Sequence, residues 1–155
     1  MGKREREAVL SKAVENLSPG LGAFRLTDWS DEALSSLWPH SAFPWDRIGN
    51  GADETEKLEL ALWVENRLVA VGLCKLGDKA VIVEVMEGDP QIEAPLKGSR
   101  ALIIFEAAAL YAQAMGRAAV LVQPKGHRLR DLYKTVYGFS EPNPATGSPY
   151  LWRQV

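Results

Sequence analysis

Three apolar segments separated by short turns decide the fold: Leu58–Val64 (LELALWV), Leu68–Leu76 (LVAVGLCKL) and Ala80–Glu87 (AVIVEVME). The first turn is Glu65-Asn66-Arg67, and the second contains Gly77-Asp78. Connections this short join only antiparallel strands, because a parallel crossover needs a much longer segment. The stretch therefore predicts a three-stranded antiparallel meander.

The chain after this meander alternates between helical and extended patterns. Gly88-Asp89-Pro90 breaks the third strand, and Gly116 is placed to end a long alanine-rich helix. The elements predicted here are a helix from about Lys97 to Met115, a buried strand over Ala118–Val122, a helix over Arg128–Val136 and a strand over Tyr150–Gln154. This order predicts an α/β (α+β) fold, in which helices flank a mixed, mainly antiparallel sheet.

The N-terminal part of the chain has helical and irregular patterns. The predicted elements are a helix over Lys3–Leu17 that ends at Pro19-Gly20, a strand over Phe24–Leu26, a short helix capped by Ser30 that stops before Pro39, and an irregular connection over 39–57. We expect residues 1–57 and 58–155 to be two parts of a single domain.

Length and composition restrict the class of protein. The chain has 155 residues, of which 46% are hydrophobic and 25% charged, which is typical of one globular domain. It has neither an apolar run long enough to span a membrane nor the apolar segment of a signal peptide. Cys74 is the single cysteine, which excludes an internal disulfide and a cysteine-cluster metal site. We expect a soluble, cytoplasmic protein.

Charge is distributed unevenly along the chain. The net charge is -2, but residues 41–94 carry 11 acidic and five basic side chains, and residues 95–134 carry seven basic and two acidic ones. This pattern suggests two ligands of opposite sign, and the alternative is that the charges are only solvated. Nucleic-acid binding is disfavoured, because the acidic segment would repel a long polyanion.

The segment before the long helix is a candidate anion site. It reads Pro95-Leu96-Lys97-Gly98-Ser99-Arg100. A helix N-terminus offers unpaired N–H groups, Gly98 allows close approach of the backbone, and two basic side chains add charge. The alternative is an ordinary tight turn.

Residues Leu58 to Phe139 resemble the GNAT superfamily of acyl-CoA-dependent N-acyltransferases. The landmarks are the meander, the loop with Gly98, the alanine-rich helix ending at Met115-Gly116, the strand Ala119–Val122, and Leu132-Tyr133 followed by Gly138-Phe139. The resemblance implies a GNAT-like fold and transfer of an acetyl group from acetyl-CoA to a primary amine. Residues 58–155 would then carry the cofactor site.

The chain departs from the family pattern in two places. The pyrophosphate loop of the family places Arg or Gln, a glycine, and a second small residue at positions that are here Pro95, Gly98 and Arg100. Arg100 would either obstruct the site or point outward and pair with a phosphate. One residue more than usual separates Tyr133 from Gly138.

The resemblance assigns acetyl-CoA as the co-substrate. The cofactor-binding residues that it implies are Val83, Val85, Lys97, Gly98, Ser99, Arg100 and Arg128. Arg128 belongs to a basic group with Lys125, His127 and Arg130 that would meet the ribose phosphate, or would only be solvated. No metal site is expected, because His40 and His127 are isolated in the sequence.

Amine acylation by a thioester needs a base for the amine and an acid for the departing thiolate. Glu84, in the apolar strand context Val83-Glu84-Val85, is the first candidate base, unless it is an outward-facing strand residue. Glu87 is the second. The resemblance implies that Tyr133 is the acid, with Tyr137 as the alternative.

The acceptor is expected to be a cationic amine, either a small molecule or a protein. Trp38, Phe43 and Trp45 would cover the sheet as a lid or line the acceptor pocket. A homodimer is possible. The rival hypothesis is a GNAT-fold binding or regulatory protein without catalytic activity, and the altered pyrophosphate loop is the feature that supports it.

Overall fold

The computed structural model describes residues 2–39, 41, 56–91, 95–141 and 149–155. Its helices are α1 (Lys3–Leu21), α2 (Asp31–Ser35), α4 (Arg100–Ala114) and α5 (His127–Thr135). Its strands are β1 (Arg25–Thr27), β2 (Lys57–Val64), β3 (Arg67–Leu76), β4 (Ala80–Gly88), β5 (Ala119–Val122) and β6 (Leu151–Gln154). Phe43 and Trp45 lie outside the described residues.

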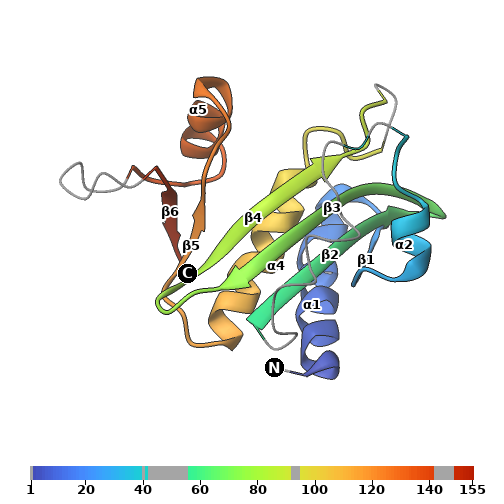
Figure 1. The fold of residues 1–155 in the computed structure, drawn as a ribbon, viewed down its shortest axis with the longest axis horizontal. Helices are drawn as coiled ribbons and strands as arrows, with labels where there is room; N and C mark the ends of the chain where they lie inside the picture. The colour runs from blue at the N-terminus through green and yellow to red at the C-terminus, as the bar shows by residue number, and fades with distance from the viewer. Residues whose placement is uncertain (1, 40, 42–55, 92–94, 142–148) are drawn as a thin grey trace.

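The strands form one mixed sheet in the order β1-β2-β3-β4-β5-β6 (Figure 1). The meander β2-β3-β4 is antiparallel, as the sequence predicted, and β1 and β6 also pair antiparallel with their neighbours. Only β4 and β5 run parallel, because α4 connects them. The predicted mixed, mainly antiparallel sheet flanked by helices is therefore confirmed.

Helices cover both faces of the sheet. On one face, α1 and α4 lie against the strands (Figure 1), and α4 buries Phe105, Tyr111 and five further residues. On the other face, Ala33 of α2 packs in a smaller apolar cluster with Trp63 and Val71. We call these the α4 face and the α2 face.

Two predicted boundaries were wrong. Helix α1 does not end at Pro19-Gly20 but continues to Leu21, although Pro19 lacks the N–H of one helical hydrogen bond. Gly22, with φ +88°, ends it, and its N–H donates to the Ser18 carbonyl at 2.9 Å. Helix α4 begins at Arg100, not near Lys97, because residues 95–99 form turns.

The C-terminal end of α4 lies where the sequence predicted it, at Gly116. Gly116 has φ +70° and follows the last helical turn. The N–H of Arg117 donates to the Ala112 carbonyl at 2.8 Å, and that of Gly116 to the Gln113 carbonyl at 3.2 Å. These two hydrogen bonds satisfy carbonyl groups at the end of α4, and they form because Gly116 adopts a positive φ.

Candidate functional site

A cleft opens where β4 and β5 separate. The two strands pair only from Ala80 to Val83 on β4, and β4 then continues to Gly88 paired with β3 alone. The resulting cleft has a volume of about 380 Å³. Its walls are β4 from Val83 to Gly88, the end of β5 with the residues after it (Val122, Gln123, Lys125), and Leu129 and Tyr133 of α5. The sequence indicated only part of this wall, because Gln123 and Leu129 stand in no recognisable motif.

Glu84 lies at an irregularity of β4. Leu73 of β3 faces Val85 and Cys74 faces Val83, so that Glu84 is an extra residue of a β-bulge. Its side chain is exposed and contributes to the cleft wall. Strand alternation cannot decide the face of such a residue, which is why the sequence left two possibilities open.

Glu87 lies three residues further along β4 and borders the same cleft. It is half-buried, and its Oε1 accepts a hydrogen bond from the Ser41 hydroxyl at 2.5 Å. Its register partner is Val71, which belongs to the apolar cluster of the α2 face. The Glu87 side chain therefore lies on the α2 face of the sheet.

Tyr133 stands on the opposite side of β4. It is buried, and its ring packs edge-on against Phe105 of α4 with 5.2 Å between ring centroids. Burial, with a smaller contribution from Tyr137, raises the pKa of Tyr133 above its usual value. The phenol therefore keeps its proton at neutral pH beside the cleft.

Tyr137 has a different position. It lies after the end of α5, and its hydroxyl donates to the Gly98 carbonyl at 3.2 Å. Its ring also contacts Phe105, with 5.4 Å between centroids. Tyr137 is not among the described residues that line the cleft, and its hydroxyl instead ties the end of α5 to the turn before α4.

The turn before α4 has the geometry of an anion site. Gly98 has φ +94°, a conformation that favours glycine, and a Cβ added there would meet open space. Lys97 and Gly98 are exposed, and Ser99 is the N-cap residue of α4. The first N–H groups of α4 have no partner inside the helix. This combination fits a diphosphate, so the residues present fit coenzyme A.

Arg100 binds backbone carbonyls at this turn and does not point outward from it. Its guanidinium folds back across Gly88, where Nη1 donates to the Asp89 carbonyl at 2.7 Å and Nη2 to the Pro95 carbonyl at 3.3 Å. A Cβ on Gly88 would lie 3.2 Å from Arg100 Cδ and collide with Nη1. Because Gly88 has no side chain, the Arg100 side chain can lie against the backbone at the end of β4.

Asp89 anchors this arrangement. Its carboxylate is buried and accepts hydrogen bonds from Arg67 Nη2 at 2.8 Å, Arg67 Nε at 3.0 Å and the Gln91 N–H at 3.1 Å. Burial would raise the pKa of Asp89, but these hydrogen bonds and the charges of Arg67 and Arg100 outweigh it, so the pKa lies below its usual value. The sequence showed Asp89 only as part of a strand break.

The remaining candidates are distributed around the cleft. Val83 is buried on the α4 face, and Val85 packs against the cluster of the α2 face; both border the cleft. Lys125 also borders it, whereas Arg128 is exposed on the first turn of α5 and is not among the described lining residues. Arg130 pairs with Glu141, at 3.0 Å between Nη2 and Oε2.

Comparison with known proteins was made by sequence and by structure. No protein-family model matches the chain, and no curated protein matches it by sequence. Its structure is similar to that of a GNAT family acetyltransferase from Elizabethkingia anophelis with acetyl-CoA bound, with a TM-score of 0.54, 10% identity, and coverage of 85% of this chain and 98% of that one. This protein has the GNAT fold.

Two further structures with the same fold show the range of the similarity. The ribosomal-protein-S18-alanine N-acetyltransferase from Escherichia coli has a TM-score of 0.59 at 15% identity, over 84% of this chain and 90% of that one. The PaiA N-acetyltransferase from Thermoplasma acidophilum in complex with coenzyme A has a TM-score of 0.58 at 12% identity, over 86% and 99%. Identities this low establish the GNAT fold and leave the activity to be argued from the site.

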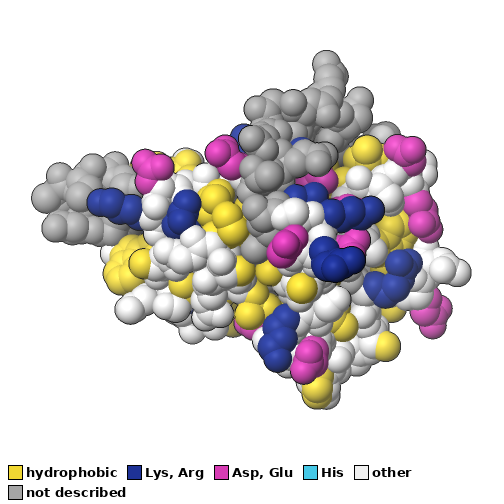
Figure 2. Space-filling model, turned by 90° about the horizontal axis from the view of Figure 1, so that it is seen from below, with side chains coloured by type: hydrophobic (Ala, Val, Ile, Leu, Met, Phe, Trp, Pro, Cys, Tyr) yellow, Lys and Arg dark blue, Asp and Glu magenta, His cyan; other side chains and the backbone are white. Residues whose placement is uncertain are grey.

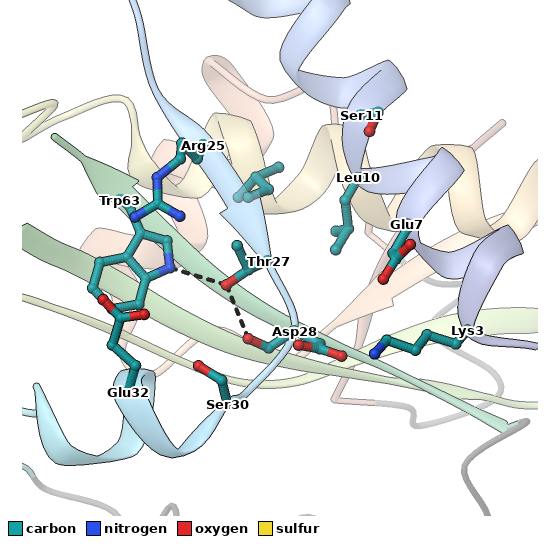
Figure 3. Close-up of a pocket in the computed structure, with 11 residues that line it drawn as sticks. Lys3, Glu7, Leu10, Ser11, Arg25, Thr27, Asp28, Ser30, Glu32 and Trp63 are labelled. Atoms are coloured by element: carbon teal, nitrogen blue, oxygen red, sulfur yellow. Dashed lines mark hydrogen bonds between the residues drawn. The ribbon is translucent and has the colours of Figure 1, made fainter. Parts of the chain in front are cut away.

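A separate hollow lies at the β1 edge of the GNAT fold, with a volume of about 430 Å³ (Figure 3). Lys3, Glu7 and Ser11 of α1, Arg25 and Thr27 of β1, and Glu32 of α2 surround it, with Trp63 at its inner wall. The Trp63 Nε1 donates to the Thr27 hydroxyl at 2.9 Å, and the Arg25 guanidinium lies 5.1 Å from the centre of the indole ring. β2 and β3 separate this hollow from the cleft beside β4.

Basic and acidic side chains are interspersed on the face of the molecule that Figure 2 shows. Four acidic residues of the segment 41–94 (Asp46, Asp53, Glu54 and Glu93) lie outside the described residues. Within the part of the chain that the structure describes, no helix is long and apolar enough to cross a membrane, and no three His, Cys, Asp or Glu side chains gather in a metal-binding group.

Proposed function

We propose that this protein is an N-acyltransferase that moves an acetyl group from acetyl-CoA to a primary amine. The observation that carries the proposal is the cleft between β4 and β5, which has a protonated phenol, Tyr133, on the α4 side and a carboxylate, Glu87, on the α2 side. An acid and a base on opposite sides of one strand suit a reaction in which the thiol leaves on one side and the amine enters from the other.

The reaction removes two protons from the nitrogen of an incoming ammonium and supplies one to the thiolate. Glu84 or Glu87 would take the proton of the incoming ammonium, so that the amine nitrogen can form the new bond to the thioester carbonyl carbon. The C–S bond then breaks, Tyr133 would give its proton to the thiolate, and the second proton of the nitrogen would return to the Tyr133 oxygen. The two carboxylates have different surroundings, since Glu84 is exposed and Glu87 accepts a hydrogen bond from Ser41. Substituting each glutamate separately would tell which of them is the base.

The turn before α4 would bind the diphosphate of coenzyme A. Lys97 supplies charge, and Gly98 and Ser99 present backbone beside the helix N-terminus. Val83 and Val85 would line the path of the pantetheine arm, and Arg128 would meet the ribose phosphate. Arg100 would act through the shape of the turn, because its guanidinium already binds two backbone carbonyls.

Calorimetry with acetyl-CoA tests the cofactor site. Gly98→Asp places a negative charge where the diphosphate should lie, and Gly98→Ala is the matched control, because both variants share the strain of a side chain at φ +94°. We expect at least tenfold weaker binding for Gly98→Asp than for Gly98→Ala, since a like charge opposes the phosphates. Equal affinity in the two variants would place the diphosphate elsewhere.

Kinetics test the acid. Tyr133→Phe is expected to lower kcat by about 10²-fold, within the usual contribution of a general acid or base, with little change in the affinity for acetyl-CoA. Tyr137→Phe is the matched control, because it removes a neighbouring phenol that hydrogen-bonds to the Gly98 carbonyl. An equal loss in both variants would remove Tyr133 from the mechanism.

The acceptor proposed is a cationic amine, free or on a protein, that approaches from the α2 face. Trp38 packs against the apolar cluster on that face, and Glu87 lies there. A panel of polyamines, amino acids, lysine peptides and neutral arylamines, assayed by thiol release at two salt concentrations, tests this. Acceptance of neutral amines alone, without dependence on salt, would contradict it.

A catalytically inactive binding protein is the second candidate, and the arginine at position 100 of the cofactor turn is the observation that favours it. Acetyl-CoA binding raises the melting temperature if the native state alone binds the ligand. The absence of any such shift would favour the second candidate over the acyltransferase.

A further inference from the structure

The hydrogen bond between Ser41 and Glu87 joins two segments that lie 46 residues apart in the chain. The Ser41 hydroxyl donates to Glu87 Oε1 at 2.5 Å, which is the length of a strong hydrogen bond to a charged oxygen. Ser41 is half-buried and comes after α2 in the chain, and its partner Glu87 lies on the α2 face. The bond therefore connects the proposed acceptor side of the cleft to one of the two candidate bases.

Packing on the α2 face determines where the Ser41 hydroxyl lies. Trp38 packs against the apolar cluster that contains Val71, and the Trp38 carbonyl accepts a hydrogen bond from the Ser41 N–H at 3.1 Å. Val71 of β3 is also the register partner of Glu87 on β4. The backbone of Ser41 and the carboxylate of Glu87 are therefore held against the same part of the sheet, where the short serine side chain reaches the carboxylate.

The other candidate base, Glu84, has no comparable support. It is exposed at the β-bulge of β4, and no hydrogen bond or ion pair holds its carboxylate within the part of the chain that the structure describes. An unrestrained glutamate side chain samples several rotamers, and ordering it costs conformational free energy each time it must act. A carboxylate that is held in place before the amine arrives avoids most of this cost.

We infer that Ser41 is a positioning residue for the acyl transfer, and that it makes Glu87, rather than Glu84, the base. This inference rests on the proposed function. The Ser41 hydroxyl orients the carboxylate through Oε1. The Glu87 carboxylate takes one of the two protons that leave the ammonium nitrogen and later returns it to water, while the other proton goes to the Tyr133 oxygen after Tyr133 has protonated the thiolate.

Kinetics of acetyl transfer, with the most active amine of the panel described above, test the role of Ser41. Ser41→Ala should lower kcat about tenfold and leave the KM for acetyl-CoA unchanged, because a displaced carboxylate loses part of the contribution of a base. Ser41→Thr keeps the hydroxyl and should restore most of kcat. Ser36→Ala is the matched control, since the Ser36 hydroxyl donates at 2.7 Å to the Glu32 carbonyl and borders none of the cavities described here, and it should leave kcat unchanged.

A second background separates positioning from support of the fold. Glu87→Gln keeps an amide oxygen that can accept the Ser41 hydrogen bond, but it cannot act as a base. Adding Ser41→Ala to Glu87→Gln should therefore lower kcat by less than about twofold further, because no base is left to be positioned. An equal loss from Ser41→Ala in both backgrounds would show that Ser41 supports only the local structure, and would overturn the inference.

Urea denaturation tests the hydrogen bond itself and needs no acceptor. Wild type, Ser41→Ala, Glu87→Ala and the double variant form a double-mutant cycle. The double variant should lose less stability than the sum of the two single losses, because each single change already breaks the same bond. Additive losses would show that the bond does not form in solution, and would also overturn the inference.

The outcomes separate the inference from the proposed function. Full activity of Glu87→Gln together with a large loss in Glu84→Gln would overturn the inference and leave the proposed function standing, because a carboxylate of the cleft would still be the base. Failure of acetyl-CoA to bind the folded wild-type protein, or the absence of thiol release with every amine of the panel, would overturn the proposed function itself.

Discussion

Removing the Asp89 carboxylate should destabilise the protein strongly, although the residue lies outside every recognised motif. The perturbation is Asp89→Ala. It breaks three hydrogen bonds, two from Arg67 and one from the Gln91 N–H, and leaves Arg67 and Arg100 near one another without the negative charge between them. The three groups connect the start of β3, the end of β4 and the start of α4.

The magnitude follows from burial. Breaking a buried ion pair by removing one partner costs about 3–5 kcal/mol. Here the Asp89 side chain is 4% exposed but that of Arg67 is 36% exposed, so that water replaces part of the lost interaction. We therefore expect a loss of about 2–3 kcal/mol in the free energy of unfolding at pH 7.

The pH dependence has a definite sign. The pKa of Asp89 is lower in the folded protein than its usual value, so the unfolded chain binds the proton more readily. The contribution of Asp89 is complete above the unfolded pKa and is lost as pH falls through the folded pKa. The difference between wild type and Asp89→Ala should therefore be constant near neutrality and shrink below about pH 4.

Urea denaturation at several pH values measures this effect. Glu7→Ala, which removes an exposed carboxylate from α1, is the control and should change stability by less than about 0.5 kcal/mol. Equal stability of the two variants at pH 7, or a difference between Asp89→Ala and wild type that grows on acidification, would refute the reasoning.

Three further changes test other parts of the structure. Tyr111→Phe should raise the free energy of unfolding by about 1 kcal/mol, measured by denaturation, because the Tyr111 hydroxyl is buried without a hydrogen-bond partner in the described chain; an unchanged or lower stability would contradict this. Gly88→Ala should lower stability by about 1–2 kcal/mol by displacing the Arg100 guanidinium, and the same variant combined with Arg100→Ala should lose much less than the sum of the two single effects. Burial raises the pKa of the Cys74 thiol to about 12, so a thiol reagent at pH 8 should react with the protein only after it unfolds, and rapid reaction of the native protein would show that the site opens.

The sequence was sufficient to predict most of the fold, because its strongest signals are local. Valine- and leucine-rich segments with turns between them predict β2, β3 and β4, and Gly116 marks the end of α4. The predicted end of α1 was wrong because the helix continues past Pro19 and stops at Gly22, which has a positive φ. Helix α4 begins later than predicted because the turn with Gly98 precedes the helix rather than opening it.

The candidate site was less accessible to sequence reasoning, because its decisive features are contacts between distant segments. Asp89 binds Arg67 and lies beside Arg100, and nothing in the spacing of these residues indicates that they meet. The roles of the two tyrosines also depend on position in space: Tyr133 borders the cleft, whereas the hydroxyl of Tyr137 binds the Gly98 carbonyl. The proposal of Tyr133 as acid rests on this difference.

The β-bulge in β4 explains why one strand can serve both sides of the proposed reaction. Strict alternation would place Val83, Val85 and Glu87 on one face, and Glu87 would then lie in the apolar core under α4. With Glu84 as the extra residue, Val83 stays on the α4 face, and Val85 and Glu87 move to the α2 face. Met86, opposite Gly72, moves to the α4 face, and it borders the cleft. A single inserted residue thus keeps Val83 on the α4 face and places Glu87 on the α2 face, as the proposed reaction requires.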